Sequence, residues 1–177
     1  MARLFFAIWP PAATAAALCE WAGLVQRSAG GRALDAAAIH LTLAFLGDVE
    51  PERAAAAIAA ARSVRGVPHV LPVEETKHWP RNDIVCVGPR ETPPPLEALA
   101  SSLAAALAGE GFALERRRFA AHVTLLRKVR VAPRLPPLPQ LEWPVEEFSL
   151  VRSTLAAGGS RYEIVERFPL RQDAPRI

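Results

Sequence analysis

The chain has 177 residues, of which 51% are hydrophobic and 22% are charged, and its formal net charge is +3. This length fits one soluble domain, or two small lobes that share a core. The high hydrophobic content and the small net charge exclude an intrinsically disordered chain. The two cysteines, Cys19 and Cys86, are too few for a disulfide framework or a thiolate metal site, so we expect a reducing compartment.

The beginning of the chain imitates a secretory signal peptide, because residues 4–19 carry no charge and follow Arg3. Pro10 and Pro11 interrupt the apolar run, however, and Leu18 stands where a cleavage site needs a small residue. No other apolar run reaches the roughly 18 to 20 residues that span a bilayer. We therefore expect a cytoplasmic protein without a membrane segment.

The first half of the chain predicts strands and helices in the order β, α, β, α, β, β. Short runs rich in Leu, Phe, Ile and Val predict strands, and Ala-rich runs bounded by Pro and Gly predict helices. The predicted elements are a strand at 3–9, a helix at 12–27, a strand at 38–46 closed by Gly47, a helix at 51–65, and strands at 70–79 and 84–87.

The second half contains one more Ala-rich run, a proline-rich stretch and two alternating segments. Prolines favour a stiff, extended connection, and alternating segments on either side of glycines favour a hairpin. The predicted elements are a helix at 96–108 capped by Thr92 and ended by Gly109 and Gly111, a strand at 121–126, an extended connection at 133–144, and a hairpin of 147–155 and 162–168 turning at Gly158 and Gly159. Elements mixed in this way predict the α+β class with antiparallel sheets.

The most informative feature is a tetrapeptide, His-x-Thr-Leu, that occurs twice, at residues 40–43 and 122–125. In a chain of this composition, two copies are expected by chance roughly once in 10⁴ sequences. Since side chains alternate along a strand, the histidine and threonine of each copy point to one face, and the neighbouring apolar residues point to the other. Two similar lobes that face each other would bring both copies to one cleft.

These residue types predict acid-base chemistry on a phosphodiester. Imidazole titrates at about pH 6.5, so at neutral pH one of His40 and His122 can accept a proton while the other donates one. The hydroxyls of Thr42 and Thr124 can donate hydrogen bonds to phosphate oxygens, which are strong when the acceptor is charged. This pattern does not demand a metal.

The charge distribution around the second copy predicts an anionic substrate. From Arg116 to Arg134 the chain has seven cations and no acid. Arginine provides 19 of the 21 basic residues, and its planar guanidinium can bind two phosphate oxygens at once. The alternative is that a composition rich in alanine and arginine leaves these cations as solvated loop charges.

The segments His40-Leu-Thr-Leu-Ala-Phe-Leu-Gly47 and His122-Val-Thr-Leu-Leu-Arg127 resemble the paired motifs of the 2H phosphoesterase superfamily. The more specific resemblance is to the bacterial RNA 2',3'-cyclic phosphodiesterase (2'-5' RNA ligase, LigT/ThpR) family. It extends over nearly the whole chain and includes the opening segment 3–10, the strand that contains Trp79 and ends at Gly88, and residues 160–162.

The resemblance implies a bilobal, pseudo-twofold α+β fold, in which each lobe is an antiparallel sheet backed by helices and the active-site cleft lies between the lobes. Residues 1–177 would then form a single domain, with one motif in each lobe. The implied activity is hydrolysis of an RNA 2',3'-cyclic phosphate end to a 2'-phosphomonoester, with possible reverse 2'-5' ligation and without a metal or other cofactor. The implied partner is RNA that carries this end, and we expect the enzyme to be a monomer.

By the same similarity, His40 is the proton donor to the departing 3' oxygen, and His122 is the proton acceptor that activates water. Thr42 and Thr124 would hold the nonbridging phosphate oxygens. Arg127 matches a basic position of the motif.

Two features depart from the family pattern or fit it only with a local change. Ala121 stands where the family often has proline before its second histidine. Strict alternation from His122 puts Arg127 on the face opposite the chemistry, so a bulge or the end of the strand must redirect it. Arg161 and Tyr162 are further candidates for RNA binding, with Tyr162 stacking on a base or lining the cleft.

Other polar and aromatic residues receive structural interpretations. His69 and His78 are expected to be structural, and Phe5, Phe6 and Phe45 are expected in the core. The place of Trp79 stays open between the core and a nucleotide groove.

Three alternative functions remain. A noncatalytic module that binds RNA ends or nucleotides would keep the cleft without turnover, and a phosphodiesterase could act on another small cyclic nucleotide. A zinc hydrolase needs three or more convergent ligands, and the sequence contains no HExxH motif or comparable carboxylate cluster.

Overall fold

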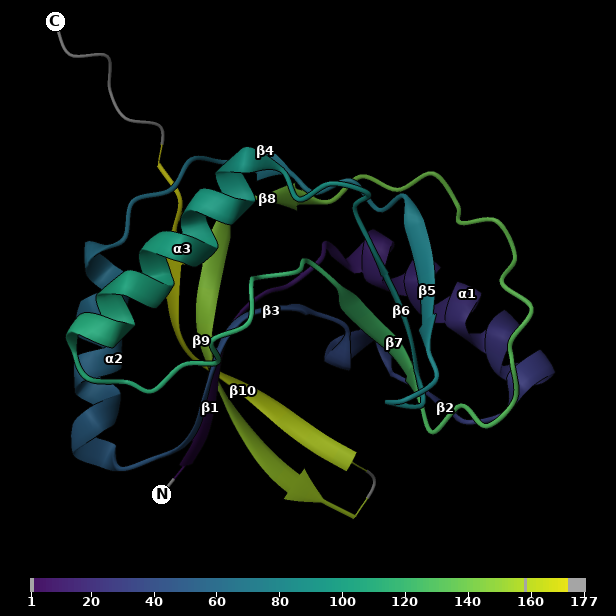
Figure 1. Ribbon diagram of the computed structural model, residues 1–177, viewed down its shortest axis with the longest axis horizontal. Helices are drawn as coiled ribbons and strands as arrows, with labels where there is room; N and C mark the ends of the chain where they lie inside the picture. The colour runs from purple at the N-terminus through teal and green to yellow at the C-terminus, as the bar shows by residue number, and fades with distance from the viewer. Residues whose placement is uncertain (1, 158, 172–177) are drawn as a thin grey trace, which may run out of the picture.

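The computed structural model describes residues 2–157 and 159–171, and Figure 1 shows how its elements are arranged. The helices are α1 (Ala12–Ala29), the 3-10 turn η1 (Ala36–Ala38), α2 (Pro51–Ser63) and α3 (Pro94–Gly109). The strands are β1 (Ala2–Ile8), β2 (Arg32–Ala33), β3 (Leu41–Val49), β4 (His69–Val70), β5 (Glu75–Trp79), β6 (Ile84–Gly88), β7 (Val123–Arg127), β8 (Pro144–Val145), β9 (Glu147–Ala156) and β10 (Gly159–Pro169).

Eight of these strands form one sheet in the order β10-β9-β1-β3-β7-β6-β5, with β2 paired to β7 off this path. The short strands β4 and β8 form a separate pair. Every strand pair within the described residues is antiparallel. The predicted α+β class with antiparallel sheets is therefore confirmed.

The large sheet is narrow at its middle. Strands β3 and β7 pair through Leu41 opposite Val123, whereas the pairs on either side of this junction are longer. Helices α2 and α3 lie side by side next to the β1, β3, β9 and β10 half, and α1 lies against β2 and β7 (Figure 1). The strands thus form one sheet with a narrow junction, and its division into two pseudo-twofold lobes stays a prediction.

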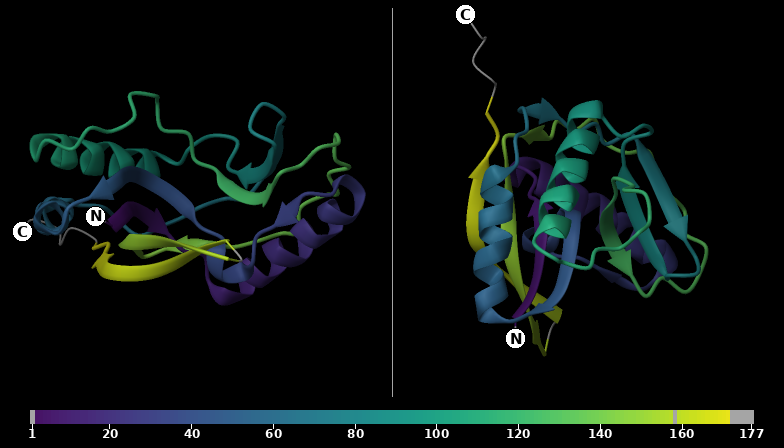
Figure 2. Two further views of the ribbon diagram at one scale, coloured as in Figure 1. Left: turned by 90° about the horizontal axis from the view of Figure 1, so that it is seen from below. Right: turned by 60° about the vertical axis from the view of Figure 1, so that its left-hand side comes forward.

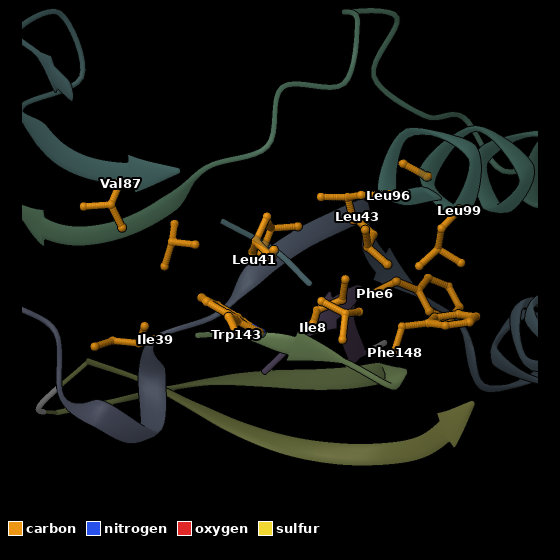
Figure 3. Packing of buried hydrophobic residues seen from close by; sticks show 14 of the residues in the cluster. Phe6, Ile8, Ile39, Leu41, Leu43, Val87, Leu96, Leu99, Trp143 and Phe148 are labelled. Carbon is orange, nitrogen blue, oxygen red and sulfur yellow. The ribbon is translucent and has the colours of Figure 1, made fainter. Parts of the chain in front are cut away.

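The core lies between the sheet and the helices (Figure 3). Alternate residues of β1, namely Leu4, Phe6 and Ile8, are buried there beside Trp143 and Phe148. A second, smaller cluster on the opposite face of β1 contains Phe5 and Ala7 with Val151. Both faces of β1 are therefore covered, which explains why this strand is almost continuously apolar.

Most predicted elements are confirmed, but several of their predicted boundaries are wrong. The predicted strand at 70–79 is split, because Pro72 has no backbone N–H for a ladder; β4 ends at Val70 and pairs with β8, and β5 begins at Glu75. Gly47, with φ +74°, does not close β3, which continues to Val49.

The helix that Thr92 was expected to cap begins at Pro94, with Pro93 as its N-cap and no side-chain capping bond. The predicted strand at 38–46 begins later, at Leu41, because residues 36–38 form the turn η1. The hairpin of β9 and β10 is confirmed, but Gly158 of its predicted turn lies outside the described residues.

The proline-rich segment is extended, as predicted, and it runs alongside α1 (Figure 2). The indole Nε1 of Trp21 donates a hydrogen bond to the carbonyl of Pro136 at 3.1 Å. The hydroxyl of Thr14 donates one to the carbonyl of Glu142 at 2.7 Å. The segment ends at the fully buried Trp143, so this connection also contributes to the core.

Within the described ranges, each helix is too short or too polar to cross a bilayer.

Candidate active site

The two His-x-Thr-Leu copies meet at the narrow junction of the sheet. His40 and His122 each lie one residue before β3 and β7 begin, and Leu41 pairs with Val123. Extending this antiparallel register by one residue sets His40 opposite Thr124 and Thr42 opposite His122. Residues that face each other across a ladder point to the same side, so all four predicted residues share one face.

Each histidine is oriented by the carbonyl two residues before it. The Nδ1 atom of His40 lies 2.8 Å from the oxygen of Ala38, and the Nδ1 atom of His122 lies 2.8 Å from the oxygen of Ala120. A carbonyl can only accept, so Nδ1 carries a proton in both rings. The Nε2 atoms are thereby left for proton transfer.

Aromatic rings surround His40 closely. The ring of Trp9 stacks on it at a centroid distance of 4.9 Å and an angle of 21°, and Phe5 lies 5.0 Å away. Tyr162 contacts it edge-on at 5.2 Å and 77°. These rings exclude water and so disfavour the charged imidazolium.

The pKa of His40 is lowered from 6.5 to about 4. Burial is the largest cause, and the hydrogen bond to Ala38 opposes it. Electrostatic interactions with Arg127 and His122 lower this pKa further, which also shows that these two residues lie near His40. In the free protein, His40 is therefore neutral at pH 7.

Trp79 plays the corresponding part beside His122. Its ring lies 4.9 Å from the His122 ring at an angle of 56°. Trp79 pairs with Ile84, and Ile84 pairs with Arg127, so β5 presents Trp79 on the same face as the site. Of the two places that the sequence left open for Trp79, the structure favours the one beside the site.

A bulge turns Arg127 toward the site. Thr124 pairs with Cys86 and Leu126 pairs with Val85, so Leu125 is an extra residue in β7. Both Leu125 and Leu126 are fully buried, and the residue that follows returns to the face of Thr124. This is the redirection that the sequence required, and Arg127 lines the cavity at His40.

A bulge also occurs in β3, directly after Thr42, as the bulge in β7 directly follows Thr124. Ala7 pairs with Thr42 and Phe6 pairs with Ala44, so Leu43 is the extra residue. Phe45, three residues after Thr42, consequently returns to the site face and is 52% exposed. The prediction that Phe45 lies in the core is wrong for this reason. Phe6 is in the core, as predicted, and Phe5 is buried in the small cluster beneath the site.

A cavity of about 570 Å³ extends from His40 and Thr42 along the strands. It contains residues that no motif had indicated, and their common property is a donor group on the site face. They are Arg3, Arg32, Ser153 and Ser160. Arg3 and Ser160 belonged to the segments 3–10 and 160–162 of the resemblance, so the sequence offered a signal for them, whereas strand pairing brings Arg32 and Ser153 to the cavity. Tyr162 lines this cavity, but Arg161 is exposed and is not among its lining residues.

The basic cluster at 116–134 is less concentrated than the sequence suggested. Arg117 forms an ion pair with Glu115, and Arg118 forms one with Glu97 at 3.3 Å. Of the seven cations, Arg127 is the one that lines the cavity at His40.

The remaining histidines and cysteines do not line this cavity. His69 contacts the carbonyl of Val67 through Nδ1 at 2.8 Å, and neither it nor His78 lines the cavity. Burial raises the pKa of the Cys86 thiol to about 11, so the thiol stays protonated, and Cys19 and Cys86 are both unpaired. In the described part of the chain, no group of three or more His, Cys, Asp or Glu residues is arranged to hold a metal ion.

Comparisons with known proteins place this geometry in a family. The model of the family described as LigT like Phosphoesterase matches the chain twice, at residues 8–86 and 87–162, so each match contains one His-x-Thr-Leu copy. The chain is 36% identical over 172 residues to an RNA 2',3'-cyclic phosphodiesterase of Escherichia coli (strain K12), covering 96% of this chain and 97% of that protein. It is 33% identical to the protein of the same description from Thermus thermophilus, covering 98% and 93%.

Solved structures agree with this result. The crystal structure of E. coli LigT complexed with 3'-AMP matches with a TM-score of 0.90 and 36% identity, covering 97% of this chain and 99% of that chain. A crystal structure of a Thermus thermophilus protein matches with a TM-score of 0.82 and 31% identity, covering 97% and 100%. The chain therefore belongs to the LigT-like phosphoesterase family.

Proposed function

We propose that this phosphoesterase hydrolyses RNA 2',3'-cyclic phosphate ends to 2'-phosphomonoesters. The observation that carries the proposal is the meeting of two His-Thr pairs on one face of the β3–β7 junction. The descriptions of the two curated relatives support the choice of substrate.

The reaction needs one base and one acid on opposite sides of phosphorus. His122 Nε2 takes a proton from water as the water oxygen bonds to phosphorus. His40 Nε2 gives a proton to the 3' oxygen as the bond between phosphorus and that oxygen breaks. Thr42 and Thr124 donate hydrogen bonds to the nonbridging oxygens, and Arg127 balances their charge. Each proton transfer typically accelerates such a step by about 10²- to 10⁴-fold.

The lowered pKa of His40 has a consequence for this mechanism. A general acid must carry its proton when the leaving group departs, yet His40 is neutral in the free protein at pH 7. A bound phosphate brings a negative charge near His40 and offsets the positive charge of Arg127. Both effects raise the pKa of His40. The substrate therefore helps to protonate the group that cleaves it.

The same groups permit the reverse ligation. If the 5'-hydroxyl of a second RNA replaces water as the nucleophile, departure of the 3' oxygen leaves a 2'-5' linkage.

The RNA itself would contact Tyr162 at the cavity wall and Arg161 outside the cavity. The exposed ring of Phe45 offers a face on which a base can stack.

We further propose that the protein is a cytoplasmic monomer built as one domain, each half of which supplies one motif. One chain provides all the residues of the site, and both cysteines are free, which suits a reducing compartment. The double match of the family model supports the division into halves.

The test is hydrolysis of a short RNA with a 2',3'-cyclic phosphate end, in the presence of EDTA, followed by phosphorus NMR. Wild type should give the 2'-phosphate, and His40→Ala and His122→Ala should each lose about 10²- to 10⁴-fold in kcat/KM. His69→Ala is the matched control, since its ring makes the same Nδ1 contact outside the cavity. RNA that binds to wild type and keeps its cyclic phosphate would favour the noncatalytic module or another cyclic nucleotide.

A further inference from the structure

The cavity continues beyond the residues that the proposed reaction uses. Along β1, Ala7 pairs with Thr42, Phe5 pairs with Phe45, and Arg3 stands at the far end. Four residues of a strand span roughly 13 Å, so the backbone of Arg3 lies well away from the His-Thr pairs, although on the same face. Arg3 nevertheless lines the same cavity.

The side chain of Arg3 leans back toward the site. Its guanidinium carbon lies 5.8 Å from the centre of the Phe45 ring, which is one row closer to Thr42 than its own backbone. Among residues 2–157 and 159–171, no carboxylate forms an ion pair with Arg3, although Asp48 is its partner in the strand register. The guanidinium thus contacts an aromatic ring, and its positive charge is not neutralised by a carboxylate, so it is available to bind an anionic ligand.

Hydroxyl groups also line this cavity. Ser153 of β9 pairs directly with Arg3, and Tyr162 of β10 pairs with Ser153. Ser153, Ser160 and Tyr162 all line the cavity with Arg3. Guanidinium groups among several hydroxyl donors form a set of groups that binds a phosphodiester. A second guanidinium, that of Arg32, lies next to Ser160, because its Nη1 atom would be 2.8 Å from a Cβ atom at Gly159.

We propose, resting on the proposed function, that Arg3 and the serines beside it bind the phosphate on the 5' side of the nucleotide that carries the cyclic phosphate. The guanidinium of Arg3, which lies over Phe45, then holds one phosphate while Thr42 holds the next, with one nucleoside between them. Arg3 is a specificity-determining residue, because it makes the enzyme prefer RNA ends over free nucleoside cyclic phosphates.

The test compares three substrates that share one reactive group. They are adenosine 2',3'-cyclic phosphate, the same compound with a 5'-phosphate, and the dinucleotide ApA with a terminal 2',3'-cyclic phosphate. Wild type should have a kcat/KM about tenfold higher for the last two, since a charge-assisted hydrogen bond to phosphate is lost in the first. In Arg3→Gln this ratio should fall to near one, and Arg3→Lys should restore part of it.

A second comparison does not depend on any variant. In this comparison, an uncharged methylphosphonate replaces the phosphate that joins the two nucleosides, and the terminal cyclic phosphate is kept. The kcat/KM of wild type for this compound should fall to its value for adenosine 2',3'-cyclic phosphate. Arg152→Gln is the matched control, because Arg152 is a neighbouring arginine that pairs with Glu163 at 3.1 Å and does not line this cavity. Its three kcat/KM values should equal those of wild type.

The outcomes separate the two proposals. Equal kcat/KM values of wild type for all three substrates, or an unchanged ratio in Arg3→Gln, would overturn the Arg3 subsite and leave the proposed function intact. A wild-type protein that hydrolyses none of the three would overturn the proposed function and the subsite with it.

Discussion

At the scale of single residues, the environment of His40 decides its protonation. Rings from three different strands or loops exclude water from it, while the carbonyl of Ala38 fixes which nitrogen is exposed to the site. The same imidazole that resists a proton in the free protein is proposed to donate one to the leaving oxygen. The energy for this change comes from the negative charge of the substrate.

The titration of His40, followed by NMR, should respond to a bound phosphate. In the free protein the ring of His40 should titrate with a pKa of about 4. Saturation with adenosine 2'-phosphate should raise that pKa by about one to three units, because an opposite charge nearby favours the imidazolium. The signal is assigned by its loss in His40→Gln. Adenosine without a phosphate is the control, and an equal shift with both compounds would contradict the electrostatic explanation.

The sequence predicted the four His and Thr residues because a repeated motif needs no knowledge of the fold. It also stated the condition for Arg127, namely a bulge, which Leu125 provides. It could not predict that Leu43 makes the equivalent bulge in β3, because both leucines look like ordinary core residues. Phe45 was expected in the core as a large aromatic residue, and this bulge turns it to the site face instead.

At the scale of elements, close approach between β6 and β7 positions the second histidine. A Cβ atom at Gly88 would lie 2.7 Å from the carbonyl oxygen of Ala121 and 3.5 Å from the Cα atom of His122. Real Cβ atoms do not come this close to backbone oxygen, so one of the strands would have to move. Gly88 thus allows the backbone before His122 to lie against β6.

Gly88→Ala should therefore damage both stability and activity. We expect a loss of about 1 to 3 kcal/mol in the free energy of unfolding and at least a roughly tenfold lower kcat/KM, as misplaced proton-transfer groups lose rate. Urea unfolding and hydrolysis of the RNA substrate measure the two effects.

Gly109→Ala is the control, since a Cβ there meets nothing within 4 Å and alanine favours helix α3 by about 0.5 to 1 kcal/mol. If Gly88→Ala kept full activity, the backbone contact would not matter for His122.

Element boundaries were predicted well where side-chain pattern and breakers agree, as in α1 and in the hairpin of β9 and β10. The predicted boundaries were wrong where a local sequence pattern disagreed with the pairing of strands in the sheet. The run at 70–79 looks like one strand in the sequence, but its first part pairs with β8 and its last part with β6. The proline-rich connection was correctly predicted as extended, and its hydrogen bonds to α1 depend on a tertiary contact that no local pattern specifies.

At the scale of the whole molecule, the site makes folding depend on pH. The pKa of His40 is about 4 in the folded protein and 6.5 in the unfolded chain, so the unfolded chain binds more protons between these values. Stability is therefore complete above pH 6.5 and is lost as the pH falls toward 4.

The expected loss from His40 between pH 7 and pH 4 is about 2 to 3 kcal/mol, with allowance for partial exposure of the ring. Urea unfolding of wild type and His40→Gln at pH 7, 5.5 and 4.5 measures it. The variant removes this contribution and keeps that of the carboxylates, so the free energy of unfolding of wild type should fall by about 2 to 3 kcal/mol more than that of the variant as the pH falls. Parallel curves would contradict the lowered pKa.

The narrow junction of the sheet has a mechanical consequence. One residue pair, Leu41 with Val123, connects β3 to β7, and the proposed phosphate site lies directly on it. A phosphate held by Thr42 from one side and Thr124 from the other is a crosslink between the halves, and its binding free energy adds to their cohesion. Each turnover then forms and breaks this crosslink at the narrow junction of the sheet.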